Sequence, residues 1–307
     1  MASPSERVLV TGAAGFTGRH LCAHLAEHGY RVFGISEHAV ERHAGPHELL
    51  QADLLDPASL EAAIEIAQPD LVVHLAAIAF PGHAQADAIY RVNINGSLAL
   101  LESLTRLGFG KKGVLLPSTG TVYGSAAADA LDEDAQLAPS SHYAVSKLAM
   151  ERMSHLFARS LPIVIVRPFN YTGPGQREPY LVPKIVRHFA ERATVIELGN
   201  VDVERDFLDV RTVVDTYRRL LESPAAIGQT FNLCSGTGIA IRDIVALLER
   251  ITGHSMEIRV NPQFVRVGEA RRIVGSHAKL AGVIGDLALI PLATTLADML
   301  AEATPGG

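Results

Sequence analysis

TGAAGFTG, residues 11–18, joins the apolar run RVLVT at 7–11 to a segment at 18–28 with the residue types of a helix. Glycines 12, 15 and 18 allow a tight turn and let the backbone approach an anion. The helix start adds free N–H groups and the positive end of its dipole. Three glycines at this spacing are weak evidence alone, and a plain tight turn is the alternative. Their place at the first strand-to-helix turn predicts a dinucleotide pyrophosphate site.

The chain continues outward from this loop as alternating strands and helices. Strands are expected at 7–11, 30–35, 70–75, 113–117 and 163–167, and helices at 18–28, 59–67, 86–107 and 143–160. Strands that alternate with helices of this length predict a parallel sheet covered on both faces. Right-handed crossovers then make it a Rossmann-like, doubly wound α/β fold.

The pattern changes after Pro168, where turn-forming residues cluster. Shorter elements follow, with helices expected at 182–191, 210–221 and 241–252 and a strand at 195–198. We expect an NAD(P)-binding Rossmann domain at 1–168 and a smaller C-terminal substrate-binding lobe at 169–307. Part of that lobe, about 207–236, is expected to return to the first domain.

Composition excludes several classes of protein. Of 307 residues, 48% are apolar, which excludes a disordered chain, and the net charge of −6 with no Lys/Arg-rich run excludes a nucleic-acid-binding stripe. The start of the chain lacks a signal peptide pattern, and the most apolar stretch, 71–80, is too short to cross a membrane. Two cysteines cannot form a disulfide framework. We expect a cytoplasmic protein with no membrane partner and no metal site.

The end of the second expected strand bears on cofactor choice. NAD-binding folds often place an acidic residue there to hold the ribose hydroxyls. Ser36 stands at that place, Glu37 follows it, and Arg42 lies nearby. A small polar residue with an arginine suits a 2′-phosphate, so NADP(H) is favoured, and NAD(H) stays possible because Glu37 can bind ribose. Asp53 and Leu54 follow the next turn, where the carboxylate can accept from the adenine amine. Ordinary surface charges are the alternative.

A second group of residues is suited to acid–base chemistry. Tyr143 and Lys147 are four residues apart, so they share one face of a helix. A free phenol with a pKa near ~10 is a poor base at neutral pH, and a nearby ammonium favours its ionised form. Thr119 follows the strand at 113–117, and ligands bind at such strand ends. We therefore choose Thr119 to bond the reacting oxygen, with Ser118 and Thr121 as alternates. A solvated lysine, a packed tyrosine and turn hydroxyls are the structural alternative.

With these pieces the chain resembles the extended short-chain dehydrogenase/reductase family, the NAD-dependent epimerases and dehydratases. The matching motifs lie in family order: TGAAGFTG, Asp53-Leu54, HLAA at 74–77, VNING at 92–96, STGTVYG at 118–124, YAVSK at 143–147 and RPFN at 167–170. The resemblance implies that Thr119, Tyr143 and Lys147 form a hydride-transfer site. It also implies a set of cofactor contacts. Besides Ser36, Glu37, Arg42, Asp53 and Leu54 named above, these are Gly12, Gly15, Phe16, Thr17, Gly18, Leu75, Ala76, Ala77, Asn93, Tyr143, Lys147 and Pro168.

The residues after Thr119 narrow the reaction within this family. Nucleotide-sugar dehydratases carry an acidic residue there, because water loss needs a carboxylate to move protons. Gly120 and Thr121 occupy those places and cannot act as that base. Dehydration is therefore disfavoured, while reduction or epimerisation at carbon 4 needs only the Thr, Tyr and Lys side chains.

The second half resembles the reductases of GDP-linked 4-keto-6-deoxy sugars within the family. The motifs are RPFNYTGPGQ at 167–176, VERDFLDV at 203–210, FNLCSG at 231–236 and RVGEARRIVGSHAKL at 266–280. This resemblance implies NADPH-dependent reduction of GDP-4-keto-6-deoxy-D-mannose to GDP-D-rhamnose. The substrate contacts that it implies are Ser118, Thr119, Asn170, Lys184, Arg205, Arg266 and Glu269. Exposed surface charge is the alternative for each arginine.

Other functions remain open from the sequence. A nucleotide-sugar 4-epimerase uses the same three side chains with tightly bound NAD. A 4-ketoreductase with a heptose substrate, or with a talose-type product, also fits. A non-enzymatic dinucleotide sensor is disfavoured because Tyr143 and Lys147 are both present. A homodimer is expected through the helices at 86–107 and 143–160, with Tyr90, Leu98 and Met150 as candidate contacts or core residues.

Overall fold

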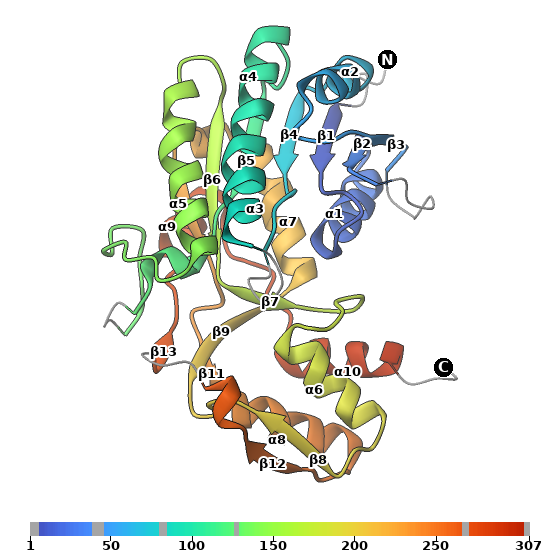
Figure 1. Ribbon diagram of the computed structural model, residues 1–307, viewed down its shortest axis with the longest axis vertical. Helices are drawn as coiled ribbons and strands as arrows, with labels where there is room; N and C mark the ends of the chain where they lie inside the picture. The colour runs from blue at the N-terminus through green and yellow to red at the C-terminus, as the bar shows by residue number, and fades with distance from the viewer. Residues whose placement is uncertain (1–5, 39–45, 80–84, 126–128, 266–269, 304–307) are drawn as a thin grey trace.

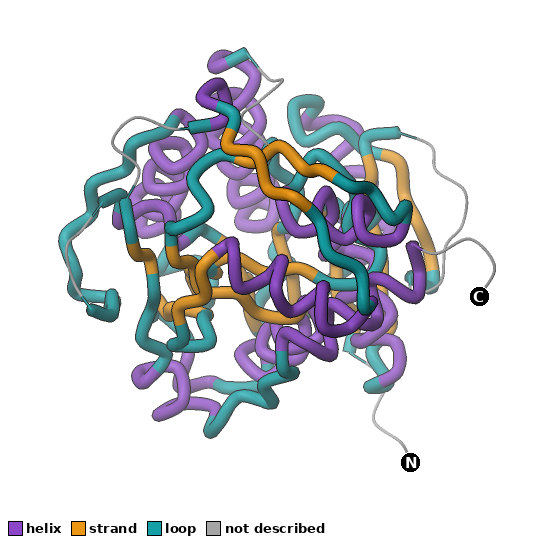
Figure 2. The backbone as a smooth tube through the Cα atoms, turned by 90° about the horizontal axis from the view of Figure 1, so that it is seen from below, coloured by secondary structure: helices purple, strands orange, loops and turns teal. Residues whose placement is uncertain are grey.

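The computed structural model describes residues 6–38, 46–79, 85–125, 129–265 and 270–303. Its larger part is a seven-stranded parallel sheet with helices on both faces, and a smaller lobe lies beyond the carboxyl ends of those strands (Figure 1). Figure 2 views the molecule from the side of that lobe and shows helices around the strands. The doubly wound fold class expected from the sequence is confirmed.

The sheet has the strand order β10-β6-β5-β4-β1-β2-β3, in which the chain reverses direction between β1 and β4. Such a reversal places a ligand site at the carboxyl ends of the strands. The strands are β1 (Arg7–Thr11), β2 (Arg31–Ser36), β3 (Glu48–Gln51), β4 (Leu71–His74), β5 (Gly113–Pro117), β6 (Ile163–Pro168) and β10 (Thr230–Leu233).

Five helices cover the two faces of this sheet. They are α1 (Phe16–Glu27), α2 (Pro57–Ala67), α4 (Ser97–Leu107), α5 (His142–Ser154) and α7 (Val210–Leu221). Val8 and Val10 of β1 pack into the core cluster that includes residues of α1 and α7, and Leu9 packs into the cluster under α2, α4 and α5. Successive residues of a strand point to opposite faces, so a strand buried on both faces must be apolar throughout.

The smaller lobe has its own core. Three helices, α6 (Leu181–Ala190), α8 (Ile241–Thr252) and α10 (Leu292–Ala303), contribute to it. Its strands are β7 (Asn170–Thr172), β8 (Val195–Leu198), β9 (Glu204–Asp209), β11 (Gly238–Ala240), β12 (Glu257–Val260) and β13 (Arg272–Ile273). Strand β10 and helix α7 leave this lobe, because β10 pairs with β6 in the large sheet and α7 packs on α1. A short helix, α9 (Ala278–Ile284), packs against β10.

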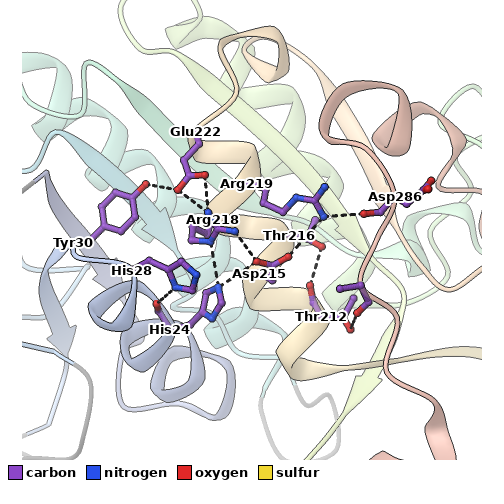
Figure 3. A network of polar contacts seen from close by, with 11 residues as sticks. His24, His28, Tyr30, Thr212, Asp215, Thr216, Arg218, Arg219, Glu222 and Asp286 are labelled. Atoms are coloured by element: carbon purple, nitrogen blue, oxygen red, sulfur yellow. Dashed lines mark hydrogen bonds and ion pairs between the residues drawn. The ribbon is translucent and has the colours of Figure 1, made fainter.

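A polar network fixes α7 to α1 on the side away from the glycine loop (Figure 3). Arg218 donates to Asp215 at 2.8 Å and to Glu222 at 2.7 Å, and the hydroxyl of Tyr30 donates to the same Glu222 at 2.8 Å. His24, at the end of α1, lies 3.4 Å from Asp215. The late segment of the chain that holds α7 is thus bound to the helix that starts at the glycine loop.

Some expected elements differ in detail. The helix expected at 86–107 consists of α3 (Ala86–Tyr90), a π-helical turn at Arg91–Gly96 and α4. The helix expected at 143–160 ends at Ser154 and continues as one 3₁₀ turn. Met150, a candidate dimer contact or core residue, is fully buried in the core. Within the described ranges, no helix is both long and apolar enough to cross a membrane.

Candidate active site

The glycine loop leaves no room for side chains at two of its positions. A Cβ on Gly12 would lie 2.8 Å from the backbone nitrogen of Ala76, and the φ of Gly12 is +66°. A Cβ on Gly18 would overlap the carbonyl oxygen of Gly12. Because Phe16 and Thr17 begin α1, their N–H groups have no partner within the helix and remain available for an anion. The loop therefore fits a pyrophosphate held by backbone and helix start.

A buried histidine connects this loop to the rest of the site. The Ser97 hydroxyl donates to the Asn93 carbonyl at 2.7 Å, so it accepts from His74 Nε2 at 2.9 Å. His74 Nδ1 must then accept from the Thr11 hydroxyl at 2.7 Å, and Thr11 accepts from the Ala76 N–H at 3.1 Å. Burial, with a smaller effect of nearby positive charge, lowers the pKa of His74 to about 3, so its ring stays neutral and keeps this tautomer.

Asn93 sits in the π-helical turn and bonds to two segments of the site. Its Oδ1 accepts from the Ile78 N–H at 2.8 Å, and its Nδ2 donates to the Ile78 carbonyl at 3.2 Å and to Ser146 Oγ at 3.0 Å. Ser146 in turn donates to the Tyr143 carbonyl at 2.8 Å. Single π-helical turns are frequent at functional sites because they redirect one side chain. Asn93 thereby holds the loop after β4 against the helix that carries Tyr143.

Helix α5 begins directly before the two residues singled out on it. Ser141 caps the helix, since its hydroxyl accepts from the Ala144 N–H at 3.2 Å. The Lys147 ammonium is buried and donates to the Pro117 carbonyl at 2.6 Å, at the end of β5. Thr119 is 6% exposed, and its hydroxyl lies close enough to the Tyr143 phenol to lower the pKa of that phenol. The structure therefore brings Thr119, Tyr143 and Lys147 together at one strand end.

Burial sets the protonation of this group. Burial lowers the pKa of Lys147 to about 8, while the Glu151 carboxylate opposes that change. Burial raises the pKa of the Tyr143 phenol, as do the nearby phenols of Tyr171 and Tyr180, and the nearby Thr119 hydroxyl opposes this rise. Near neutral pH the lysine is a cation and the phenol keeps its proton. The arrangement can donate a proton and stabilise the phenolate that remains.

The structure contains a buried ion pair behind the site that was not predicted from the sequence. Glu151 accepts two bonds from Arg167, at 3.0 and 2.8 Å, and both side chains are at most 6% exposed. Arg167 also donates to the Tyr123 hydroxyl at 2.9 Å, which donates to Asn232 at 2.7 Å. Glu151 lies four residues after Lys147 on the same helix face, and this spacing is the signal that could have found it.

The residues expected at the adenosine end occupy several positions. Ser36 ends β2 and is half-buried, and Glu37 is exposed beside it. Arg42 lies outside the described residues. The Asp53 carboxylate accepts from the Leu55 N–H at 2.8 Å, and Leu54 is buried in the core under α2 and α4. Ser36 directly follows Ile35, whose carbonyl accepts from the Ala13 N–H of the glycine loop at 3.1 Å, and this position suits a ribose or its phosphate.

Other predicted contacts lie where the two parts of the fold meet. Leu75 and Ala77 are half-buried in the segment after β4, and Pro168 ends β6 and is buried. Asn170 is exposed at the start of β7 and donates to the Asp206 carbonyl at 3.2 Å. The Ser118 hydroxyl is shielded from solvent and has no hydrogen-bond partner among the described residues. Beside it, Thr119 is the hydroxyl that lies near the Tyr143 phenol.

The basic residues expected at the sugar nucleotide have other partners in the structure. Lys184 donates to the Glu197 carbonyl at 2.7 Å, and its ammonium lies 4.8 Å from the centre of the Phe264 ring. Arg205 is half-buried and donates to the Ala270 carbonyl at 3.0 Å. Arg266 and Glu269, expected beside it, lie outside the described residues. Their predicted roles stay predictions.

The parallel sheet, the glycine loop after its first strand and the Thr/Tyr/Lys group define an NAD(P)-dependent oxidoreductase. Residues 8–234 match the model of the NAD dependent epimerase/dehydratase family. The chain belongs to this family, which confirms the resemblance drawn from its motifs.

Two relatives and one solved structure are similar to this chain over nearly their full length. GDP-6-deoxy-D-talose 4-dehydrogenase of Aggregatibacter actinomycetemcomitans is 37% identical over 91% of this chain and 92% of its own. GDP-6-deoxy-D-mannose reductase of Pseudomonas aeruginosa is 35% identical over 97% of both. A solved structure of RMD from Pseudomonas aeruginosa complexed with NADPH superposes with a TM-score of 0.85, at 33% identity over 99% of both chains. Full-length similarity of this kind extends through the second lobe.

Proposed function

We propose that this protein reduces the 4-keto group of a GDP-linked 4-keto-6-deoxyhexose with NADPH, converting GDP-4-keto-6-deoxy-D-mannose to GDP-D-rhamnose. The observation that carries the proposal is the group of Thr119, Tyr143 and Lys147 at one strand end, beside a loop that fits a pyrophosphate. The two relatives named for GDP-linked 6-deoxy sugars support the substrate class.

NADPH, when bound, supplies a hydride to the ketone carbon. The residues of the chain handle the oxygen and the proton. Tyr143 donates its proton to that oxygen, and Thr119 holds the developing negative charge with its hydroxyl. Lys147, buried within the same group, stabilises the phenolate that forms on Tyr143. The raised pKa of the phenol in the free protein suits this direction, because the proton is present before the reaction starts.

The cofactor would lie along the loop after β1 and the loop after β4. The free N–H groups at the start of α1 would hold its pyrophosphate, and Ser36 would leave space for a 2′-phosphate. The relative solved with NADPH supports NADP(H) over NAD(H). Lys147 would also reach the ribose next to the nicotinamide.

Reduction suits the site better than dehydration. Among the described residues the Thr119 hydroxyl bonds to Thr121 and lies near the Tyr143 phenol, and neither side chain is a carboxylate. Dehydration needs a carboxylate at that place to move protons. The relative named for 6-deoxy-D-talose supports a second candidate, in which the same hydride transfer gives the opposite configuration at carbon 4.

One assay tests these proposals together. Purified protein is mixed with NADPH and GDP-4-keto-6-deoxy-D-mannose, and nicotinamide absorbance is followed, with NADH and with UDP- and dTDP-linked ketosugars as controls. We expect NADPH consumption with the GDP sugar, and NMR of the product separates the rhamnose from the talose configuration. No turnover with any nucleotide-linked ketosugar contradicts the reductase. NAD that stays bound through purification, with no net consumption of NADPH, indicates an epimerase.

The pH dependence follows from Lys147. We expect kcat/KM for NADPH, which reports groups of the free enzyme, to be level near pH 7 and to fall above a pH of about 8. The reason is that loss of the proton from Lys147 removes the cation that stabilises the phenolate. The phenol does not cause this fall, because its own pKa is raised.

Lys147→Arg is the control for this prediction. A guanidinium stays charged far above pH 8, so the variant keeps a cation that does not titrate in this range. Its activity is expected to be lower, since the ammonium bond to Pro117 changes, but the fall above pH 8 should be absent. An unchanged fall in the variant would assign the titration to another group.

A further inference from the structure

The second lobe contacts the start of α1 through one aromatic residue. The Tyr171 hydroxyl, on β7, lies 2.9 Å from the Thr17 hydroxyl, 154 residues away in the chain. Its ring stacks on Phe16 with centroids 6.3 Å apart and an interplanar angle of 15°. One turn further along α1, His20 bonds through Nε2 to the Pro174 carbonyl at 2.8 Å. The first turn of α1 is therefore both the expected pyrophosphate site and the surface on which the second lobe rests.

Hydrogen-bond counting gives this contact a direction. Burial raises the pKa of Tyr171, so the phenol keeps its proton, and a hydroxyl has one proton and two acceptor sites. If Thr17 donated to Tyr171, its only proton would point away from the glycine loop. If Tyr171 donates, Thr17 accepts, and the Thr17 proton is free to turn toward an anion at the helix start. A pyrophosphate within reach of the Thr17 hydroxyl would favour the second arrangement.

We propose that Tyr171 of the second lobe is a cofactor-positioning residue, which donates to Thr17 and so directs the Thr17 hydroxyl to the pyrophosphate of the dinucleotide. The inference rests on the proposed function only in requiring that a dinucleotide binds. It gives the second lobe a part in holding the cofactor, in addition to the sugar nucleotide. Tyr171 is itself held in place, because β7 pairs with β9 and sets Tyr171 opposite Leu208.

A double-mutant cycle on NADPH binding tests this hydrogen-bond relay, in which Tyr171 donates to Thr17 and Thr17 donates to the pyrophosphate. Tyr171→Phe keeps the ring on Phe16 and removes the hydroxyl, and Thr17→Val removes the second hydroxyl at nearly the same volume. We expect each variant to weaken NADPH binding by about 5-fold, the scale of one hydrogen bond, measured by nicotinamide fluorescence and calorimetry. The double variant should bind no more weakly than Thr17→Val alone, because both changes break one relay.

Tyr217→Phe is the matched control. Tyr217 is fully buried on α7 near Tyr171 and Tyr143, and its hydroxyl has no hydrogen-bond partner within the described residues. Its removal should leave NADPH binding unchanged. A similar loss in Tyr217→Phe would mean that any nearby change of packing weakens binding, and would overturn the inference.

The remaining outcomes separate this inference from the proposed function. If the wild-type protein binds no dinucleotide, both fail. If it binds NADPH and Tyr171→Phe binds equally well, the inference fails and the proposed function stands. Additive losses in the double variant also overturn the relay, since they show that Tyr171 and Thr17 act independently.

Discussion

Replacing Tyr143 by Phe is expected to lower kcat for ketosugar reduction by about 10²–10⁴-fold, the usual contribution of a positioned acid or base. Phe keeps the ring and removes the phenol proton that we propose goes to the ketone oxygen. The remaining groups, Thr119 and Lys147, can still hold the oxygen but cannot replace that proton. Turnover is measured from nicotinamide absorbance at saturating substrate.

The Tyr143→Phe variant must still bind NADPH if its loss of turnover is to report on the chemical step. The Tyr143 phenol lies near Thr119, whereas the expected pyrophosphate site lies on the glycine loop, so NADPH affinity should change little. Fluorescence titration measures that affinity. Tyr30→Phe is the matched control, because its hydroxyl bonds to Glu222 in the network away from the site, and its turnover should stay near wild type. A Tyr143→Phe variant with ordinary kcat would remove Tyr143 from the mechanism.

Replacing Glu151 by Ala is expected to lower the free energy of unfolding by about 3–5 kcal/mol, the range for breaking a buried ion pair by removing one partner. The change leaves the Arg167 guanidinium buried without its carboxylate. Both side chains are almost fully buried, so water cannot take the place of the lost oxygens. Urea unfolding followed by circular dichroism gives the free energy and its denaturant slope.

Glu191→Ala is the control for this prediction. Glu191 also pairs with an arginine, Arg187, four residues away, but both side chains of that pair are more than half exposed. Exposed pairs contribute little because solvent screens them, so this variant should unfold at nearly the wild-type urea concentration. Equal effects in the two variants would show that burial of the Glu151 pair does not matter to stability.

Local sequence patterns were sufficient for much of the fold. The expected helices at 210–221 and 241–252 and the strand at 195–198 coincide with α7, α8 and β8. Each follows from the local spacing of apolar residues, over a few helical turns for the helices and along a few residues for the strand. Reading that spacing needs no knowledge of the rest of the chain. Seven strands were not expected: β3, β7, β9, β10, β11, β12 and β13. All of them except β9 have only two to four residues, which gives little periodicity to read.

Some residues of the candidate site could likewise be predicted from local sequence, and others could not. Tyr143 and Lys147 could be paired from the sequence because four residues make one turn of a helix. Thr119 could be chosen because parallel strands end at one edge of a sheet. The spacing from Lys147 could have drawn attention to Glu151, but its pairing with Arg167 could not be found, because a buried polar residue looks like a surface residue in the sequence. The contact of Tyr171 with Thr17 depends on how two distant segments close on each other.

The sequence by itself determined the glycine loop, the order of strands and helices, and the Tyr/Lys spacing, because these depend on the geometry of neighbouring residues. The return of about 207–236 to the first domain was expected, but only the tertiary structure decided that β10 pairs with β6, that Glu151 neutralises Arg167, and that Tyr171 rests on the start of α1. These contacts form only after packing brings distant residues together, and packing depends on shape and burial across the whole chain.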